Sequence, residues 1–175
     1  TTGRVLYSLD NEPDLWSHTH ARIHPPPVTY AELVERHIRF ATAIKSVAPD
    51  AEVTGPANYG FWGFETLQSA PDAAGKGNFL DHWLEQMQAA GNAAGRRLVD
   101  DLDLHWYPEA TGGGTRITSS SGATAVAAAR VQAPRSLWDP TYVENSWITN
   151  DYLGGPIELL PTVQGRIDAH YPGTS

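Results

Sequence analysis

The sequence predicts an α/β protein in which helices cover a parallel sheet. Three β-favouring runs begin near residues 5, 52 and 101, and a helical pattern follows each of them. The loops after these runs are long and rich in polar and aromatic residues, whereas the turns that lead into the next run are short. Both features are typical of a βα barrel or a doubly wound sheet that carries its site at one face.

The first unit begins with an apolar, β-favouring run over residues 4–10. A polar loop follows, and Thr29 and Glu32 then form a capping box, in which each side chain satisfies the other's backbone N–H group. Apolar residues from Tyr30 to Ile44 recur at helical spacing, and Pro49 marks the end of that helix. The unit is therefore a strand, a long loop and a helix.

The second and third units repeat this order. Residues 52–56 are predicted as a strand, residues 58–64 as an aromatic loop and residues 101–108 as the third strand. The buried face of the intervening helix comprises Leu80, Trp83, Leu84, Met87 and Ala90 or Gly91. The acidic cluster of Asp100, Asp101 and Asp103 is expected at a helix end and a strand start, where its charges stay solvated.

The last third of the chain is predicted to contain loops and short helices. Residues 109–122 are rich in Gly, Ser and Thr and are expected to form a mobile loop, and residues 123–131 form an Ala-rich helix. A second capping box, Thr141 with Glu144, predicts another helical turn. The buried face of the last helix comprises Leu160, Val163, Ile167 and Tyr171.

Composition excludes several functions. Twelve basic residues stand against 20 acidic ones, giving a net charge of −8 that would repel a nucleic-acid backbone. Without cysteine, the chain has no disulfides, thiolate-bound metals or thiol nucleophile. No apolar stretch reaches the about 18 residues that a membrane span needs. Six Trp and seven Tyr suit a ligand with apolar faces and hydroxyl edges, such as a sugar, although each one alone is as readily a core residue.

A candidate acid/base group closes the first strand. Asn11, Glu12 and Pro13 place a carboxylate beside an amide at the end of a strand, where a proline fixes the backbone. Glu12 could protonate a leaving oxygen while Asn11 donates to a sugar hydroxyl. Taken alone, these three residues also fit an ordinary turn or helix start.

The wider sequence resembles glycoside hydrolase family 44. The similarity runs through residues 7–16, 18–20, 25, 53–56, 104–108 and 135–140. It implies a (β/α)8 TIM barrel of which residues 1–175 hold three strand–helix units, strands four to six of the catalytic domain. It further implies an extracellular, retaining endo-β-1,4-glucanase that acts on cellulose, xyloglucan or xylan and needs no cofactor for catalysis.

The resemblance also assigns roles to residues. Glu12 matches the general acid/base and Asn11 its neighbour, and His105 with Tyr107 resembles a His-x-Tyr motif whose tyrosine contacts the nucleophile. The candidates for stacking against glucosyl rings are Trp16, Tyr59, Trp62, Trp106 and Trp138.

The second carboxylate of a retaining site is missing from this pattern. Retention requires two carboxyl groups about 5–5.5 Å apart. The resemblance implies that the nucleophile lies at the end of the seventh strand, as in the clan of (β/α)8-barrel glycosidases. The chain ends at Ser175, where that strand would begin, and starts at Thr1 rather than Met. We therefore expect a segment of a longer protein that is inactive when isolated. Glu65 and Glu109 are interpreted as loop charges.

Other interpretations remain open. An inactive, carbohydrate-binding half-barrel is the main alternative to an enzyme, and an open flavodoxin-like sheet is a third. His18, His20 and His24 could hold a structural metal ion, although a loop of hydrogen-bonded imidazoles is favoured. The expected partners are a polysaccharide and either further barrel segments or a second copy that covers the sheet edges, but neither nucleic acid nor a membrane.

Overall fold

The computed structural model describes residues 5–175, so Arg4, at which the first predicted strand begins, lies outside the described residues. The chain divides into two compact units. Unit 1 runs to Trp106 and resumes at Arg166–Ser175, and unit 2 is Tyr107–Gly165. That residues 1–175 belong to one catalytic domain stays a prediction. Among the described helices, none is long and apolar enough to cross a membrane.

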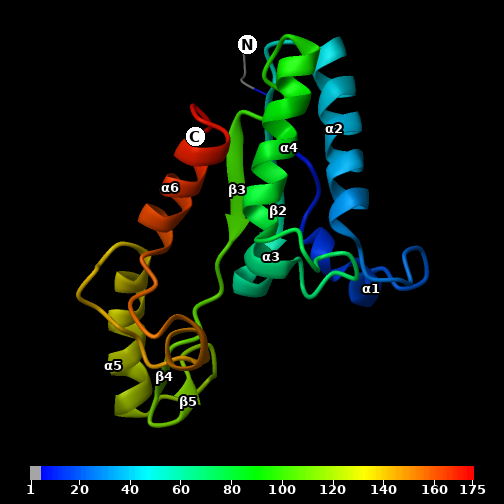
Figure 1. Ribbon diagram of the computed structural model, residues 1–175. Helices are drawn as coiled ribbons and strands as arrows, with labels where there is room; N and C mark the ends of the chain where they lie inside the picture. The colour runs from blue at the N-terminus through cyan, green and yellow to red at the C-terminus, as the bar shows by residue number, and fades with distance from the viewer. Residues whose placement is uncertain (1–4) are drawn as a thin grey trace. The chain divides into compact units, whose positions relative to one another are not determined.

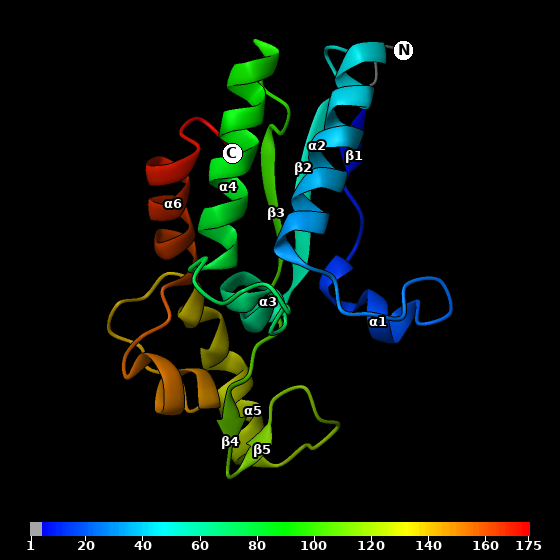
Figure 2. The ribbon, with the colours of Figure 1, turned by 45° about the vertical axis from the view of Figure 1, so that its right-hand side comes forward.

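Unit 1 is built on a parallel sheet with the strand order β1-β2-β3 (Figures 1 and 2). The strands are β1 (Leu6–Ser8), β2 (Glu52–Tyr59) and β3 (Asp101–His105). Tyr59 pairs with His105, so the carboxyl ends of β2 and β3 meet. The three predicted strands are thus present, and their rank within a barrel stays a prediction.

The last residue of the chain also bonds to β3. The Ser175 N–H donates to the Asp100 carbonyl over 3.1 Å, and the Leu102 N–H donates to the Ser175 carbonyl over 2.9 Å. These two bonds are the pattern of a parallel strand beside β3.

Two long helices, α2 (Tyr30–Val47) and α4 (Phe79–Ala94), pack against each other and run alongside the strands (Figures 1 and 2). Both helices were predicted. The Thr29 hydroxyl caps α2 by accepting from the Glu32 N–H, but the Glu32 carboxylate binds His24 and Arg36, so half of the predicted capping box is absent. Apolar side chains of both helices are fully buried: Leu33, Phe79, Leu80, Trp83, Leu84 and Met87.

The predicted aromatic loop over residues 58–64 is wrong. β2 continues to Tyr59, and α3 (Gly60–Thr66) follows at once. The strand extends because a register shift between Pro56 and Asn58 lets both of its last residues pair with β3. Gly60, with φ of 58°, then allows the turn into the helix.

The expectation that the acidic cluster is solvated is wrong for Asp100. Its Oδ2 atom lies 2.6 Å from the Lys45 Nζ atom and accepts from the Val53 N–H over 2.8 Å. Lys45 is buried and also donates to the Ala51 carbonyl. The pair ties the end of α2 to the starts of β2 and β3.

Unit 2 has more structure than the predicted loop over residues 109–122. A hairpin of β4 (Thr111–Gly112) and β5 (Thr115–Arg116) lies within it. The Arg130 guanidinium, on α5 (Thr124–Gln132), donates to the carbonyls of Ile117, Ser119 and Ser121. The shorter elements of the unit are the helical segments η2 (Ala133–Leu137) and η3 (Ile148–Leu153).

The second predicted capping box is also wrong. Residues 141–144 form no helix, because Thr141 donates both its N–H and its hydroxyl to the Asp139 carboxylate. Glu144 is buried and accepts from the Ser136 hydroxyl over 2.6 Å. The last helix, α6 (Leu159–His170), forms as predicted, but of its expected apolar face Ile167 is buried and Leu160 is exposed.

Candidate active site

The backbone between β1 and the helical segment η1 (Pro13–Leu15) turns sharply. Asp10 has a φ of 101° and Glu12 a φ of 52°, conformations that cost a non-glycine residue roughly 1–3 kcal/mol each. The Glu12 N–H donates to the Ala57 carbonyl over 2.8 Å, and the Asn11 N–H donates to the Asp10 carboxylate over 2.7 Å. These bonds hold the strained turn.

Glu12 and His105 meet at the carboxyl end of the sheet. The Glu12 Oε1 atom lies 2.8 Å from the His105 Nδ1 atom, and the two side chains are 17% and 28% exposed. A neutral imidazole can donate its Nδ1–H to this carboxylate, or accept from the carboxylic acid when Glu12 carries the proton. The geometry therefore suits a carboxyl group that both holds and releases a proton while it stays in reach of solvent.

Asp14 is a buried carboxylate in the same turn that sequence reasoning missed. Its Oδ1 and Oδ2 atoms lie 3.0 and 3.2 Å from the Tyr59 backbone nitrogen. Burial raises the pKa of Asp14 to about 6, and the hydrogen bond from the Tyr59 N–H opposes this shift. No local sequence signal predicts this burial, because the Tyr59 N–H that donates to Asp14 lies 45 residues away in the sequence.

The Tyr59 backbone pairs with that of His105 at the carboxyl end of β2. Trp62, on α3, packs edge-on against Phe61 with ring centroids 5.6 Å apart. Trp106 stacks on Phe64 with centroids 6.4 Å apart and planes inclined by 23°. Contacts with neighbouring rings therefore account for part of each tryptophan surface.

Trp16 lies on α1 (Trp16–Thr19), and its ring packs against two polar side chains. The His24 ring centroid is 5.1 Å away, and the Arg36 guanidinium carbon lies 5.6 Å from the Trp16 ring centroid. Trp16 also lines a cavity of about 380 Å³ together with Asp10 and Phe40.

The remaining candidates are exposed residues. The Asn11 side chain is exposed, and its predicted role as a sugar donor stays a prediction. Tyr107 and Trp138, 40% and 53% exposed, belong to unit 2, and their predicted roles likewise stay predictions.

The histidine-rich loop has hydrogen-bond partners for its imidazoles. His24 contacts the Pro26 carbonyl at 2.8 Å and the Glu32 carboxylate at 2.9 Å. His18 and His20 lie within hydrogen-bond distance of Ser17 and Thr19. Across residues 5–175, no group of three His, Cys, Asp or Glu side chains is arranged to hold a metal ion.

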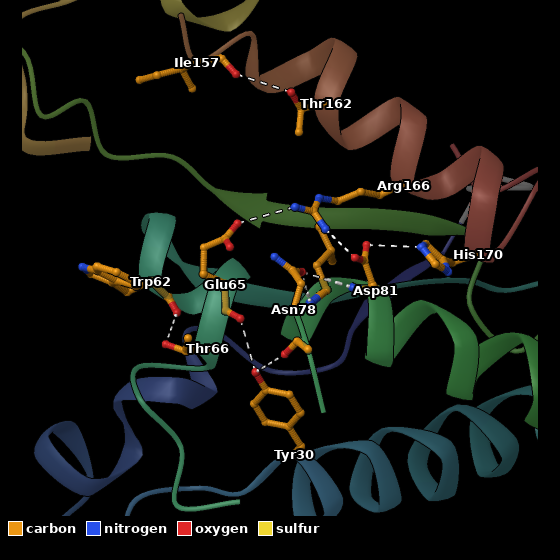
Figure 3. A network of polar contacts seen from close by, with 12 residues as sticks. Tyr30, Trp62, Glu65, Thr66, Asn78, Asp81, Ile157, Thr162, Arg166 and His170 are labelled. Carbon is orange, nitrogen blue, oxygen red and sulfur yellow. Dashed lines mark hydrogen bonds and ion pairs between the residues drawn. The ribbon is translucent and has the colours of Figure 1, made fainter. Parts of the chain in front are cut away.

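Glu65, predicted as a loop charge, lies on α3 and takes part in a polar network between helices. Figure 3 shows Arg166 between Glu65 and Asp81, with N–O distances of 3.6 and 2.6 Å. His170 reaches Asp81 at 3.5 Å from the next turn of α6. Glu109 pairs with Arg116 in unit 2.

Two known enzymes closely match the sequence. Endoglucanase A of Paenibacillus lautus is 50% identical over 179 residues, which cover 99% of this chain and 25% of that protein. Beta-mannanase/endoglucanase A of Caldicellulosiruptor saccharolyticus is 47% identical over 99% of this chain and 14% of its own length. The chain therefore spans a quarter or less of these curated relatives.

Solved structures of family 44 enzymes also have the fold of this chain. Cel44A, a family 44 endoglucanase from Clostridium thermocellum, gives a TM-score of 0.94 at 50% identity over 99% of this chain and 35% of that chain. A Paenibacillus polymyxa xyloglucanase of family 44, solved with xyloglucan, gives a TM-score of 0.92 at 48% identity over 98% of this chain and 34% of that chain. Residues 1–110 match the family model of Glycoside hydrolase family 44. The chain belongs to glycoside hydrolase family 44.

Proposed function

We propose that this chain is the part of a retaining endo-glycoside hydrolase that carries its general acid/base, Glu12. The substrate is a β-1,4-glucan-type polysaccharide, cellulose or xyloglucan, with xylan as a further candidate. The observation that carries the proposal is the Glu12–His105 contact of 2.8 Å at the carboxyl ends of parallel strands, where βα enzymes place their catalytic groups. The names of the endoglucanase and xyloglucanase relatives support the choice of substrate.

In the proposed reaction, Glu12 first protonates the glycosidic oxygen that leaves. A second carboxylate, supplied from outside this chain, attacks the anomeric carbon and forms a glycosyl–enzyme intermediate. Glu12 then removes a proton from the water that releases the sugar. His105 keeps the Glu12 side chain in one position through both steps.

We propose that this chain is the central segment of a (β/α)8-barrel catalytic domain, in which β1, β2 and β3 are strands four to six. The bonds from Ser175 to Asp100 and Leu102 support a further parallel strand beside β3. We place the missing nucleophile glutamate after that strand.

The test uses the full-length protein that carries this chain, with reducing ends released from xyloglucan and carboxymethylcellulose as the measurement. Glu12→Gln should lower kcat by about 10²–10⁴-fold, the range that general acid–base catalysis contributes. Glu35→Gln is the matched control, because Glu35 is exposed on α2. Hydrolysis by Glu12→Gln at the rate of the control would refute the proposal.

For the isolated 175 residues, we favour a carbohydrate-binding segment without turnover. The chain covers about a third of the solved family members, which supports a site completed elsewhere. Binding of cello-oligosaccharides without release of reducing ends is the expected result. Glu12-dependent release by the purified segment would contradict it.

A further inference from the structure

We propose that Asp14 is a positioning residue for Glu12, an inference that rests on the function proposed above. Asp14 closes a circuit of contacts that begins and ends at Glu12 and passes through the ends of β2 and β3.

The first half of the circuit is the turn itself. Glu12 and Asp14 are two residues apart, with Pro13 between them at the first position of η1. Asp14 is 5% exposed, and both of its carboxylate oxygens face the Tyr59 N–H at the end of β2. A short rigid segment therefore links the acid/base group to a buried anchor.

The second half passes through the sheet. The Tyr59 backbone is held at both of its polar groups. Its N–H donates to Asp14, and its carbonyl accepts from the Gln68 side chain over 3.1 Å. Tyr59 pairs with His105, and the His105 Nδ1 atom lies 2.8 Å from Glu12. A displacement of the Tyr59 peptide would therefore move His105 relative to the Glu12 carboxyl group.

The space for the Asp14 carboxylate depends on a glycine in α3. A Cβ atom added at Gly63 would lie 2.5 Å from the Asp14 Oδ2 atom, a distance that a real side chain does not allow. Gly63 thus lets the helix approach the carboxylate, and Gly63→Ala would displace Asp14 without removing its charge or its hydrogen-bonding atoms.

A substrate comparison separates positioning from a purely structural role. A natural glycan needs Glu12 to protonate its leaving oxygen, whereas a dinitrophenyl glycoside releases dinitrophenolate, which leaves without being protonated. A misplaced Glu12 should therefore slow the first reaction and spare bond cleavage in the second. Simple loss of folded protein would lower both rates by the same factor.

The experiment measures kcat/KM of the full-length protein on cello-oligosaccharide and on dinitrophenyl β-cellobioside, with the folded fraction determined by circular dichroism. Asp14→Ala should lose about 100-fold on the oligosaccharide, the cost of a small misplacement of a reacting group, and less than about threefold on the aryl glycoside. Asp14→Asn, which keeps an oxygen for the Tyr59 N–H, should recover part of the loss. Gly63→Ala should show the same substrate selectivity.

Asp72→Ala is the matched control. The Asp72 carboxylate likewise accepts from backbone N–H groups, here those of Tyr30 and Ala31, and it lies at the start of α2. Equal losses on both substrates in Asp14→Ala, no loss on either, or failure of all three site variants to fold would overturn the inference. The proposed function fails separately, if Glu12→Gln hydrolyses the oligosaccharide as fast as the unaltered protein.

Discussion

At the scale of single residues, two buried ionisable groups of unit 1 titrate in the same pH range with opposite effects on stability. Burial lowers the pKa of His37 from 6.5 to about 4, and burial raises the pKa of Asp14 from 3.8 to about 6. His37 accepts a hydrogen bond from the Trp83 indole over 2.9 Å, which favours its neutral form. Each group therefore prefers to be uncharged in the folded protein.

His37 should make the fold sensitive to acid. Above pH 6.5 the imidazole is neutral in both states and its contribution is fully present. As the pH falls from 6.5 towards 4, His37 binds a proton in the unfolded chain but not in the folded one. The free energy of unfolding therefore falls by about 3 kcal/mol. His37→Gln, which retains an acceptor for Trp83, should remove this loss. Urea unfolding of both proteins at pH 7.5 and pH 4 measures it, and parallel pH dependences would contradict the assignment.

Asp14 should act in the opposite direction. Between pH 3.8 and 6 the folded carboxyl group keeps a proton that the unfolded one releases, so stability falls as the pH rises, by about 3 kcal/mol in all. Relative to the unaltered chain, Asp14→Asn should therefore gain about 3 kcal/mol between pH 3.5 and pH 7. A constant difference across that range, in the same urea titrations, would show that the carboxyl group is not shifted. This relative gain in stability, together with slower hydrolysis of glycans, is the result expected if Asp14 is kept for positioning at a cost in stability.

At the scale of elements, Arg130 organises a segment whose composition suggests a mobile loop. Its guanidinium binds three carbonyls of residues 117–121, and one lysine ammonium cannot reproduce that planar fork. Arg130→Lys should cost about 2 kcal/mol and speed amide exchange at residues 117–121. Arg39→Lys, on the exposed surface of α2, is the control. Unchanged amide exchange in Arg130→Lys would indicate that Arg130 does not order residues 117–121.

Elements were predictable where their causes are local. The strands followed from β-favouring runs, α2 from its cap and apolar spacing, and α4 from its apolar face. The capping box at Thr141 failed because a partner five residues before it, Ser136, binds the Glu144 carboxylate that the box requires. The order of residues 117–121 was missed because Arg130, which binds their carbonyls, lies outside the segment 109–122.

The candidate site divides in the same way. Glu12 and His105 could be nominated from their places after strands and from the family resemblance, and the structure brings their side chains together. Asp14 could not be nominated from the sequence, because its burial depends on Tyr59 and Gly63. Contacts between residues so far apart in the chain produce no recognisable sequence pattern.

At the scale of the whole molecule, the isolated chain exposes apolar surface where β1 forms the edge of the described sheet. Val5, Leu6 and Tyr7 are 53%, 57% and 40% exposed, and β1 pairs with β2 along its other side. An exposed apolar edge strand is a template for pairing with another chain. In the proposed barrel, a preceding strand would cover this edge.

The isolated 175-residue chain should therefore associate in solution. Light scattering on the purified chain should give a mass above the 19.0 kDa of the monomer, because pairing at β1 buries its exposed side chains. Leu6→Lys should shift the population towards the monomer, since a lysine on an edge strand opposes pairing. Val131→Lys, at a residue 75% exposed on α5, is the control and should leave the mass unchanged. A monodisperse species of 19.0 kDa in the unaltered chain would contradict the prediction, and an equal response of both variants would locate the contact elsewhere.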